Sequence, residues 1–255
     1  MRTLIHDREA KQINFLDSRF YTNDNENYYP SVTTILEIYP KGFGFEQWLK
    51  DVGNNASQIA DRAADFGSLI HGVSERLNKG EQITWADENG TPLYTLEQWQ
   101  SILRFADFWK KCSPYLLANE ESFCSESLGY GGTIDRVLEI KGYRYLVDIK
   151  TSNYIHTSHE LQVAAYATAW NEKNQSKQID ATAILWLKPS IRTDKIDYEK
   201  QIFQGVSVAG AWQLKLFPRS YKESFEIFKH SQAIWKEENP KWIPANKTFP
   251  DFIKL

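Results

Sequence analysis

The sequence predicts an α/β fold in which a mixed β-sheet is flanked by α-helices. Two runs rich in β-branched and aromatic residues meet at Lys141 and Gly142, which predicts a β-hairpin with a tight turn. Amphipathic helical patterns lie before and after that hairpin, and a near-continuous apolar run at residues 181–187 predicts a strand buried on both faces. Helices interleaved with strands in this order predict a sheet covered by helices.

Length and composition indicate a single domain. The chain has 255 residues, 42% of them hydrophobic and 25% charged, and no internal repeat or low-complexity linker divides it. We therefore expect one domain over residues 1–255, with a helical N-terminal part at about 31–115 and a core that carries the chemistry at about 118–208.

Charge and cysteine content narrow the class of protein. The formal net charge of −3 favours a local basic groove over a surface that grips nucleic acid everywhere. Cys112 and Cys124 are too few for a disulfide framework or a four-cysteine cluster, so we expect reduced, structural thiols. No apolar stretch of signal-peptide or membrane-spanning length is found, so we expect a cytoplasmic protein that does not associate with membranes.

The N-terminal elements are predicted from caps and breakers. Residues 1–30 predict an irregular strand or arm, and Ser31 predicts the N-cap of a short helix that runs through Ile38 and stops at Pro40. Residues 42–45 contain two glycines and predict a loop. No lysine-serine pair follows them, which argues against a phosphate-binding loop.

Two longer helices are predicted before the hairpin. The first begins at Asn54 or Asn55, ends at about Asn78, and has an apolar stripe with alternating four- and three-residue spacing: Ile59, Ala63, Phe66, Ile70, Val73 and Leu77. His71 lies just off that stripe, where a histidine is commonly a surface residue. The second helix opens with a capping box at Thr95, and its expected buried residues are Leu96, Trp99, Ile102, Leu103, Ala106 and Trp109.

The hairpin at residues 129–151 carries the chemistry. With Lys141 and Gly142 in the turn, the pairs are Ile140 with Tyr143, Glu139 with Arg144, Val137 with Leu146, and Asp135 with Asp148. Both aspartates then project from one face, and Lys150 joins them two residues later. Two adjacent carboxylates repel each other unless a cation or a shared proton compensates, and a divalent metal is the simplest compensation.

Other acids and glycines near the hairpin are weaker candidates. Glu126 precedes it, but a surface position is the stronger expectation for this residue. Glu139 and Lys141 also fit an acid-x-lysine pattern, yet they abut the turn and lack an opposed carboxylate. The glycines at positions 129, 131 and 132 predict a bulge or a close approach to the backbone, because no helix follows them as a nucleotide loop would require.

The elements after the hairpin complete the predicted sandwich. A Thr157-x-x-Glu160 capping box predicts a helix to about Asn171, on which Gln162, Tyr166 and Trp170 share one face. Residues 191–208 predict a second hairpin, whose nearby cations make the best local candidate for a phosphate track: Lys188, Arg192 and Lys195. A final helix starts with a capping box at Ser220, uses Phe225, Phe228, Ala233 and Trp235 as buried contacts, and is followed by a tail expected to pack back through Trp242 and Phe249.

Four short motifs in a fixed order resemble the PD-(D/E)XK nuclease superfamily, in its RecB-type exonuclease branch. They are GSLIH at 67–71, GGTID at 131–135, DIK followed by threonine at 148–151, and QVAAY at 162–166. The SVTTIL run at 31–36 is also similar to the start of phage and mitochondrial genome maintenance exonucleases of this group. The resemblance covers roughly residues 30–190.

The resemblance implies a restriction-endonuclease-like fold and an Mg²⁺- or Mn²⁺-dependent DNA exonuclease. The implied metal ligands are His71, Asp135, Asp148 and the carbonyl of Ile149. Lys150 would help to position the attacking water, while Gln162 and Tyr166 would border the active site. The implied partner is DNA with free ends or single strands, in replication, recombination or repair. Tyr154 is a candidate for base stacking, and a protein partner or homo-oligomer stays open.

Two other functions stay open at this point. The same fold could serve as a non-catalytic module that binds nucleic acid or joins a complex, although a binder has no use for a clustered acid pair. A structural calcium site is the other alternative, which a histidine and a lysine beside the acids fit poorly. Incubation with labelled DNA and Mg²⁺, Mn²⁺ or Ca²⁺ separates the three.

Overall fold

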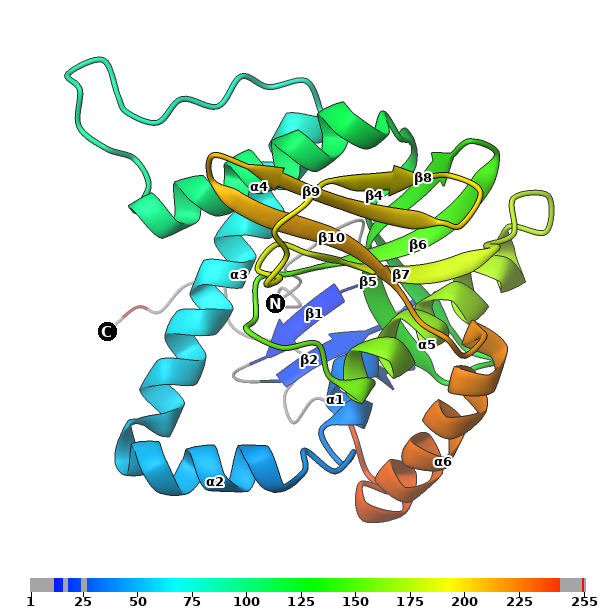
Figure 1. Cartoon of the computed structure of the whole chain (residues 1–255). Coiled ribbons are helices and arrows are strands. Elements are labelled where there is room, and N and C mark those ends of the chain that lie inside the picture. Colours follow the sequence, from blue (N-terminus) through cyan, green and yellow to red (C-terminus); the bar gives the residue numbers. More distant parts are fainter. Residues whose placement is uncertain (1–11, 16–17, 24–26, 244–253, 255) are drawn as a thin grey trace.

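A seven-stranded mixed sheet forms the centre of the protein, which is described by a computed structural model at residues 12–15, 18–23, 27–243 and 254 (Figure 1). The strands lie in the order β4-β5-β6-β7-β10-β9-β8, and only β6 and β7 are parallel. Their bounds are β4 Tyr115–Ser125, β5 Tyr130–Ile140, β6 Tyr143–Lys150, β7 Ala181–Trp186, β8 Lys195–Asp197, β9 Ile202–Ser207 and β10 Gly210–Leu216. The sheet therefore continues through β10, beyond the core predicted at about 118–208.

Helices cover both faces of this sheet, as the sequence predicts. Helices α1 (Val32–Leu36), α5 (Thr157–Lys173) and α6 (Tyr221–Glu238) pack on one face. Helices α3 (Ala56–Asn78) and α4 (Leu96–Cys112) pack on the other. Neighbouring residues of β6 divide between the two cores, since Leu146 belongs to the first and Val147 to the second. The α/β fold with a mixed sheet flanked by helices is confirmed.

The β5–β6 hairpin has the predicted register. Its observed pairs include Ile140 with Tyr143, Glu139 with Arg144, and Val137 with Leu146. Lys141 and Gly142 both have positive φ, 52° and 85°, which is the conformation of a type I′ turn. The pairing ends at Arg136 and Val147, so the predicted next pair, Asp135 with Asp148, does not form and the two strands open at the aspartates.

A small antiparallel sheet stands where the sequence predicts an irregular strand or arm. It contains β1 (Gln12–Phe15), β2 (Ser18–Tyr21) and β3 (Tyr29–Pro30). A parallel bridge joins Ser31 to Gly131, and a Cβ atom at Gly131 would lie 2.3 Å from Cβ of Tyr21. The absence of a side chain at Gly131 therefore lets the small sheet pack directly on β5.

Helix α2 (Phe43–Val52) corrects the loop predicted at residues 42–45. Gly42, with φ 78°, is its N-cap, and α2 leads through a short 3₁₀ helix (Gly53–Asn55) into α3. The helix buries none of its residues, and Phe43 is 74% exposed. The apolar residues Phe45, Trp48, Leu49 and Val52 recur at helical spacing, but the two glycines at the start of the segment favour a loop.

Three predicted burial patterns are also wrong in part. In α3 the buried apolar residues are Ile70 and Val73, because the N-terminal half projects beyond the sheet (Figure 1) and Ile59 and Ala63 are exposed. In α4 only Ile102 of the predicted stripe is buried, and the other buried apolar residues are Phe105, Phe108 and Cys112. In α6, Phe228 and Trp235 are buried but Ala233 is exposed.

The predicted helix caps are confirmed except at α5. Ser31, Thr95 and Ser220 cap their helices as expected. At α5 the N-cap is His156, and Glu160 is bound instead by Arg219 at 2.8 Å. In the tail, the Trp242 ring lies 5.3 Å from the Trp235 ring, and Phe249 falls outside the described residues. Within the described part of the chain, no helix is both long and apolar enough to cross a membrane.

Candidate active site

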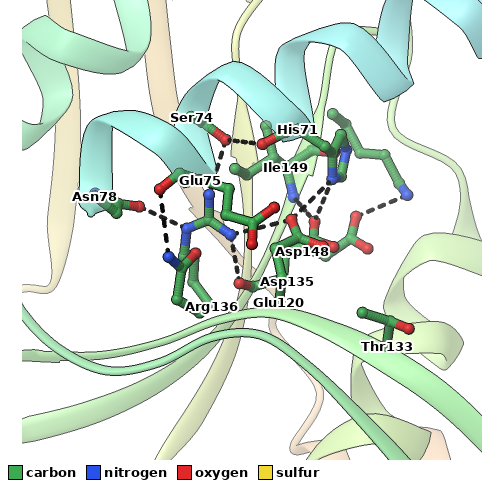
Figure 2. A network of polar contacts seen from close by, with 12 residues as sticks. His71, Ser74, Glu75, Asn78, Glu120, Thr133, Asp135, Arg136, Asp148 and Ile149 are labelled. Atoms are coloured by element: carbon green, nitrogen blue, oxygen red, sulfur yellow. Dashed lines mark hydrogen bonds and ion pairs between the residues drawn. The ribbon is translucent and has the colours of Figure 1, made fainter. Parts of the chain in front are cut away.

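Two buried aspartates lie together where the central hairpin opens (Figure 2). Asp135 of β5 and Asp148 of β6 are 6% and 2% exposed. Asp135 Oδ2 accepts a hydrogen bond from the backbone N–H of Ile149 at 2.7 Å. Asp148 Oδ2 lies 2.7 Å from Nζ of Lys150. The structure thus brings together both acids and the lysine that the sequence places on this hairpin.

Helix α3 adds His71 to this pair of acids. Its Nδ1 lies 3.3 Å from Asp135 Oδ2 and 3.7 Å from Glu120 Oε1. Its Nε2 lies 3.0 Å from the carbonyl oxygen of Ile149. The imidazole therefore connects the helix layer to the middle of β5 and the end of β6, and it contacts the carbonyl group that the family resemblance singles out.

Glu120 of β4 is a member of this group that the sequence analysis misses. The acid considered there, Glu126, is exposed, whereas Glu120 is 9% exposed. Ligand atoms of His71, Glu120 and Asp135 all lie within 4.8 Å of one another. Glu120 has φ 53°, an unusual conformation for a residue with a side chain, and no sequence pattern reveals that conformation. Backbone strain of this kind gathers at functional sites.

Arg136 holds Glu120 in place from the interior (Figure 2). Its guanidinium is 1% exposed and its Nη1 lies 3.1 Å from Glu120 Oε1. The other N–H groups donate to Asn78 Oδ1 at 2.7 Å and to Ser74 Oγ at 2.8 Å, both on α3. A buried arginine with this many partners fixes the distance between α3 and the strands.

Burial and charge set different proton affinities for the two aspartates. Burial raises the pKa of Asp148 to about 6, although the Lys150 charge opposes that shift. Burial also acts to raise the pKa of Asp135, but the positive charge and hydrogen bond of His71 outweigh it and lower that pKa. Burial would lower the pKa of His71, yet the attraction of Asp135 and hydrogen bonds to Asp135 and Glu120 raise it to about 10. The site is thus built around negative charge that attracts a cation or a proton.

The lysine stays charged in this setting. Burial would lower the pKa of Lys150, but the charges of Asp148 and Asp135 raise it. An ammonium group at neutral pH donates hydrogen bonds and does not accept a proton.

Helix α5 covers the acids with an amide and a phenol. Gln162 Nε2 donates to Asp148 Oδ1 at 3.0 Å and lies 3.3 Å from the Tyr166 hydroxyl. Burial raises the pKa of Tyr166 well above its usual value, so this hydroxyl keeps its proton. The Tyr166 ring packs over Gly132, where a Cβ atom would lie 2.5 Å from Cε1 of that ring. The glycine predicted to allow a close approach thus lets α5 reach the site.

The side chains of this site line a cleft of about 590 Å³, a size typical of ligand sites. Its walls come from α3, α5, the β5–β6 hairpin and the small N-terminal sheet. Arg19 of β2 lines this cleft, and the sequence analysis does not identify it because nothing in the local pattern of residues 1–30 links them to the hairpin.

The predicted nucleic-acid contacts lie elsewhere, since none of them lines this cleft. Tyr154 is 71% exposed in the loop between β6 and α5. Lys188 forms an ion pair with Glu97 of α4 at 3.0 Å, and Arg192 and Lys195 are exposed. The structure therefore brings together the predicted site residues of the hairpin, α3 and α5. The four predicted nucleic-acid contacts lie outside this cleft.

Comparison with known proteins agrees with this geometry. The sequence profile of the PD-(D/E)XK nuclease superfamily matches residues 46–232, which include α3, the hairpin, α5 and most of α6. The chain belongs to this superfamily. No curated protein gives a significant match. The seven-stranded sheet flanked by helices is the restriction-endonuclease-like fold, and membership indicates a hydrolytic nuclease that uses divalent metal.

The donor groups of this PD-(D/E)XK site fit a divalent cation. Carboxylate and carbonyl oxygens are the ligands that Mg²⁺ prefers, and an imidazole suits Mn²⁺ better than an all-oxygen site would. His71, Glu120 and Asp135 already face one another, and Asp148 and the Ile149 carbonyl adjoin them. A cation would offset the repulsion among three buried acids, for which Lys150 and Arg136 compensate in part.

Proposed function

We propose that this PD-(D/E)XK protein is an Mg²⁺- or Mn²⁺-dependent deoxyribonuclease of the RecB-type branch, which acts as an exonuclease on free ends or single strands in replication, recombination or repair. The observation that carries the proposal is the ion pair of Lys150 with Asp148, 2.7 Å long, beside Asp135 and His71 in one cleft. A module that only binds has no need for such a cluster of buried charge.

In this proposal the acids and the histidine form the metal site. Asp135, Asp148, His71 and the Ile149 carbonyl hold the cation, and Glu120 is a further donor to it. Such a cation lowers the pKa of a bound water and stabilises charge on the phosphate. Arg136 keeps Glu120 directed at this place while making no contact with the substrate.

Lys150 acts as a charged hydrogen-bond donor. Its raised pKa keeps the ammonium protonated, so it orients the attacking water and offsets negative charge that develops on the phosphate. Lys150 does not remove the proton from that water, because an ammonium ion has no lone pair to accept it.

Gln162 and Tyr166 keep Asp148 in position. The amide donates to one oxygen of Asp148 while Lys150 approaches the other, so the carboxylate is held from both sides. Loss of Gln162 would free the carboxylate to rotate, which lowers the precision with which ligands meet the metal.

Two observations support a substrate with a free end. The cleft is bounded on several sides by α3, α5 and the N-terminal sheet, which suits a single strand better than a duplex lying across a flat surface. The net charge of −3 also argues against broad electrostatic clamping of duplex DNA. Tyr154, which is exposed, is the proposed base-stacking residue outside the cleft, and Lys188, Arg192 and Lys195 are the proposed outer phosphate contacts.

A time course on labelled DNA tests this proposal. Single- and double-stranded DNA labelled at either the 5′ or the 3′ end, with a closed circle as control, would be incubated with Mg²⁺, Mn²⁺ or Ca²⁺. We expect linear single strands to be shortened progressively with Mg²⁺ or Mn²⁺ and closed circles to stay intact. Efficient cutting of closed duplex circles while linear single strands are ignored would make the protein an endonuclease. Binding without cleavage under every metal would make it a non-catalytic module.

A further inference from the structure

His159 is a cleft residue that the proposed metal site does not use. It lies in the first turn of α5, and with Gln162 and Tyr166 it follows a spacing of three and four residues. Side chains at this spacing share one face of a helix. All three side chains line the cleft, and Gln162 contacts Asp148. His159 lies one helical turn N-terminal to Gln162 on the same wall of the cleft.

The hydrogen bonding of His159 fixes the position of its proton. The backbone N–H of His156 donates to Nδ1 of His159 at 3.3 Å. A nitrogen that accepts a hydrogen bond carries no proton, so the ring is neutral and its proton is on Nε2. Among the residues that the structure describes, Nε2 makes no hydrogen bond.

The surroundings keep this ring neutral. Burial, the charge of Lys150 and the charge of His156 all lower the pKa of His159, to about 3. The ring therefore offers a donor group that does not change with pH in the neutral range. A neutral N–H beside a lysine suits an anionic oxygen.

We propose that His159 is a substrate-binding residue, whose Nε2–H donates a hydrogen bond to a phosphate oxygen of a nucleotide strand in the cleft. This inference rests on the proposed function, because it takes a nucleic-acid backbone as the occupant of the cleft. The phosphate concerned lies next to the one that Lys150 faces, since His159 and Lys150 are cleft residues on neighbouring elements.

A purely structural role for His159 makes a different prediction. Its Nδ1 contact caps α5, and the residue type that usually makes this contact from the third helical position is glutamate or glutamine. His159→Glu therefore retains the cap but has no N–H donor and adds a charge that repels phosphate, whereas His159→Gln retains the cap and keeps an amide donor in place of the imidazole N–H. If capping is the whole role of His159, both variants behave like the wild type.

Equilibrium binding of a fluorescein-labelled oligothymidylate, followed by fluorescence anisotropy in Ca²⁺, separates the two roles. We expect His159→Glu, which loses the hydrogen bond to a charged group, to weaken binding at least about tenfold, and His159→Gln, whose amide can donate in its place, to weaken it less. His156→Gln, at the exposed neighbour whose backbone makes the same cap, serves as the matched control and should bind normally. Thermal unfolding of all three variants should match the wild type.

Unchanged affinity in both His159 variants would overturn the inference, as would an equal loss in His156→Gln. Nitrogen-15 spectra of the histidine rings give a second reading that needs no variant. We expect the Nε2–H tautomer for His159 and a shift of its Nε2 resonance when oligothymidylate is added, and an Nδ1–H tautomer or an unmoved resonance would refute the assignment. If wild type binds the strand without ever cutting DNA, the proposed nuclease function fails while the affinity series still decides the role of His159.

Discussion

At the scale of single residues, the site assigns different tasks to chemically similar groups. Asp135 is stabilised in its charged form by His71 and by the N–H of Ile149, while burial raises the pKa of Asp148 to about 6. The two aspartate carboxyl groups therefore lie in different environments. Lys150 contacts Asp148, the one whose pKa is raised.

Asp148→Asn and Lys150→Ala should each lower the cleavage rate by more than about a hundredfold, the size of effect seen when one preorganised electrostatic contact is removed. Asparagine retains an oxygen that can accept from Gln162, and Lys150 reaches the cleft, so neither change opens a cavity in the core. Single-turnover cleavage of labelled DNA measures the rates, and thermal unfolding checks the fold. Lys222→Ala, at an exposed position on α6, is the control. Near-normal turnover in both site variants would refute the assignment.

His71→Ala should raise the metal concentration needed for half-maximal cleavage, with partial recovery in excess Mn²⁺. A lost ligand lowers affinity, yet Asp135, Asp148 and Glu120 remain to hold the ion. Calorimetric titration with Mn²⁺ provides the dissociation constant directly. A variant that titrates like the wild type would make His71 an ordinary helix histidine.

At the scale of elements, the sequence predicts those parts whose signal is local. Turn chemistry at Lys141 and Gly142 fixes the hairpin register, and with it the placement of both aspartates. Capping boxes locate α4 and α6. These signals depend on a few neighbouring residues, so no knowledge of the tertiary structure is needed to read them.

The elements that sequence reasoning misses depend on tertiary contacts. Strand β10 inserts between β7 and β9, a topology that no local pattern encodes. Glu120 joins the site through a positive φ and a buried arginine, neither of which follows from alternation along β4. Arg19 reaches the cleft because the small sheet packs on β5. In each case the decisive partner is distant in sequence.

Gly132 offers a test of how α5 is seated on the sheet. Gly132→Ala places a methyl group 2.5 Å from the Tyr166 ring, so the helix must shift. We expect a loss of about 1–3 kcal/mol in the free energy of unfolding, together with slower cleavage because Gln162 moves with Tyr166.

Gly72→Ala on α3 is the matched control, since nothing lies within 4 Å of the added carbon. It should be neutral or stabilise the helix by about 0.5–1 kcal/mol. Chemical denaturation and the cleavage assay together measure both effects. Equal behaviour of the two alanine variants would mean that the Tyr166 contact does not position α5.

At the scale of the whole molecule, the site lies where the layers of the sandwich meet. His71 belongs to the helix layer on one face, Asp135 and Asp148 belong to the sheet, and Gln162 approaches from the helix layer on the other face. Arg136 ties α3 to β4 and β5 from inside. A cation bound here would join separate elements, so its binding energy would add to the stability of the entire fold.

Mn²⁺ should therefore raise the unfolding temperature of the wild-type protein in the absence of DNA. A ligand that binds only the folded state adds about 2.7 kcal/mol at a hundred times its dissociation constant. For a domain of this size each kcal/mol corresponds to about 2–4 °C, so we expect a rise of about 5–10 °C at that concentration. The Asp135→Asn, Asp148→Asn double variant should start from a lower temperature without metal, because it leaves Lys150 and His71 without the carboxylates that they pair with. It should show little further rise with Mn²⁺, and an equal rise in wild type and double variant would place the stabilising ion away from the hairpin.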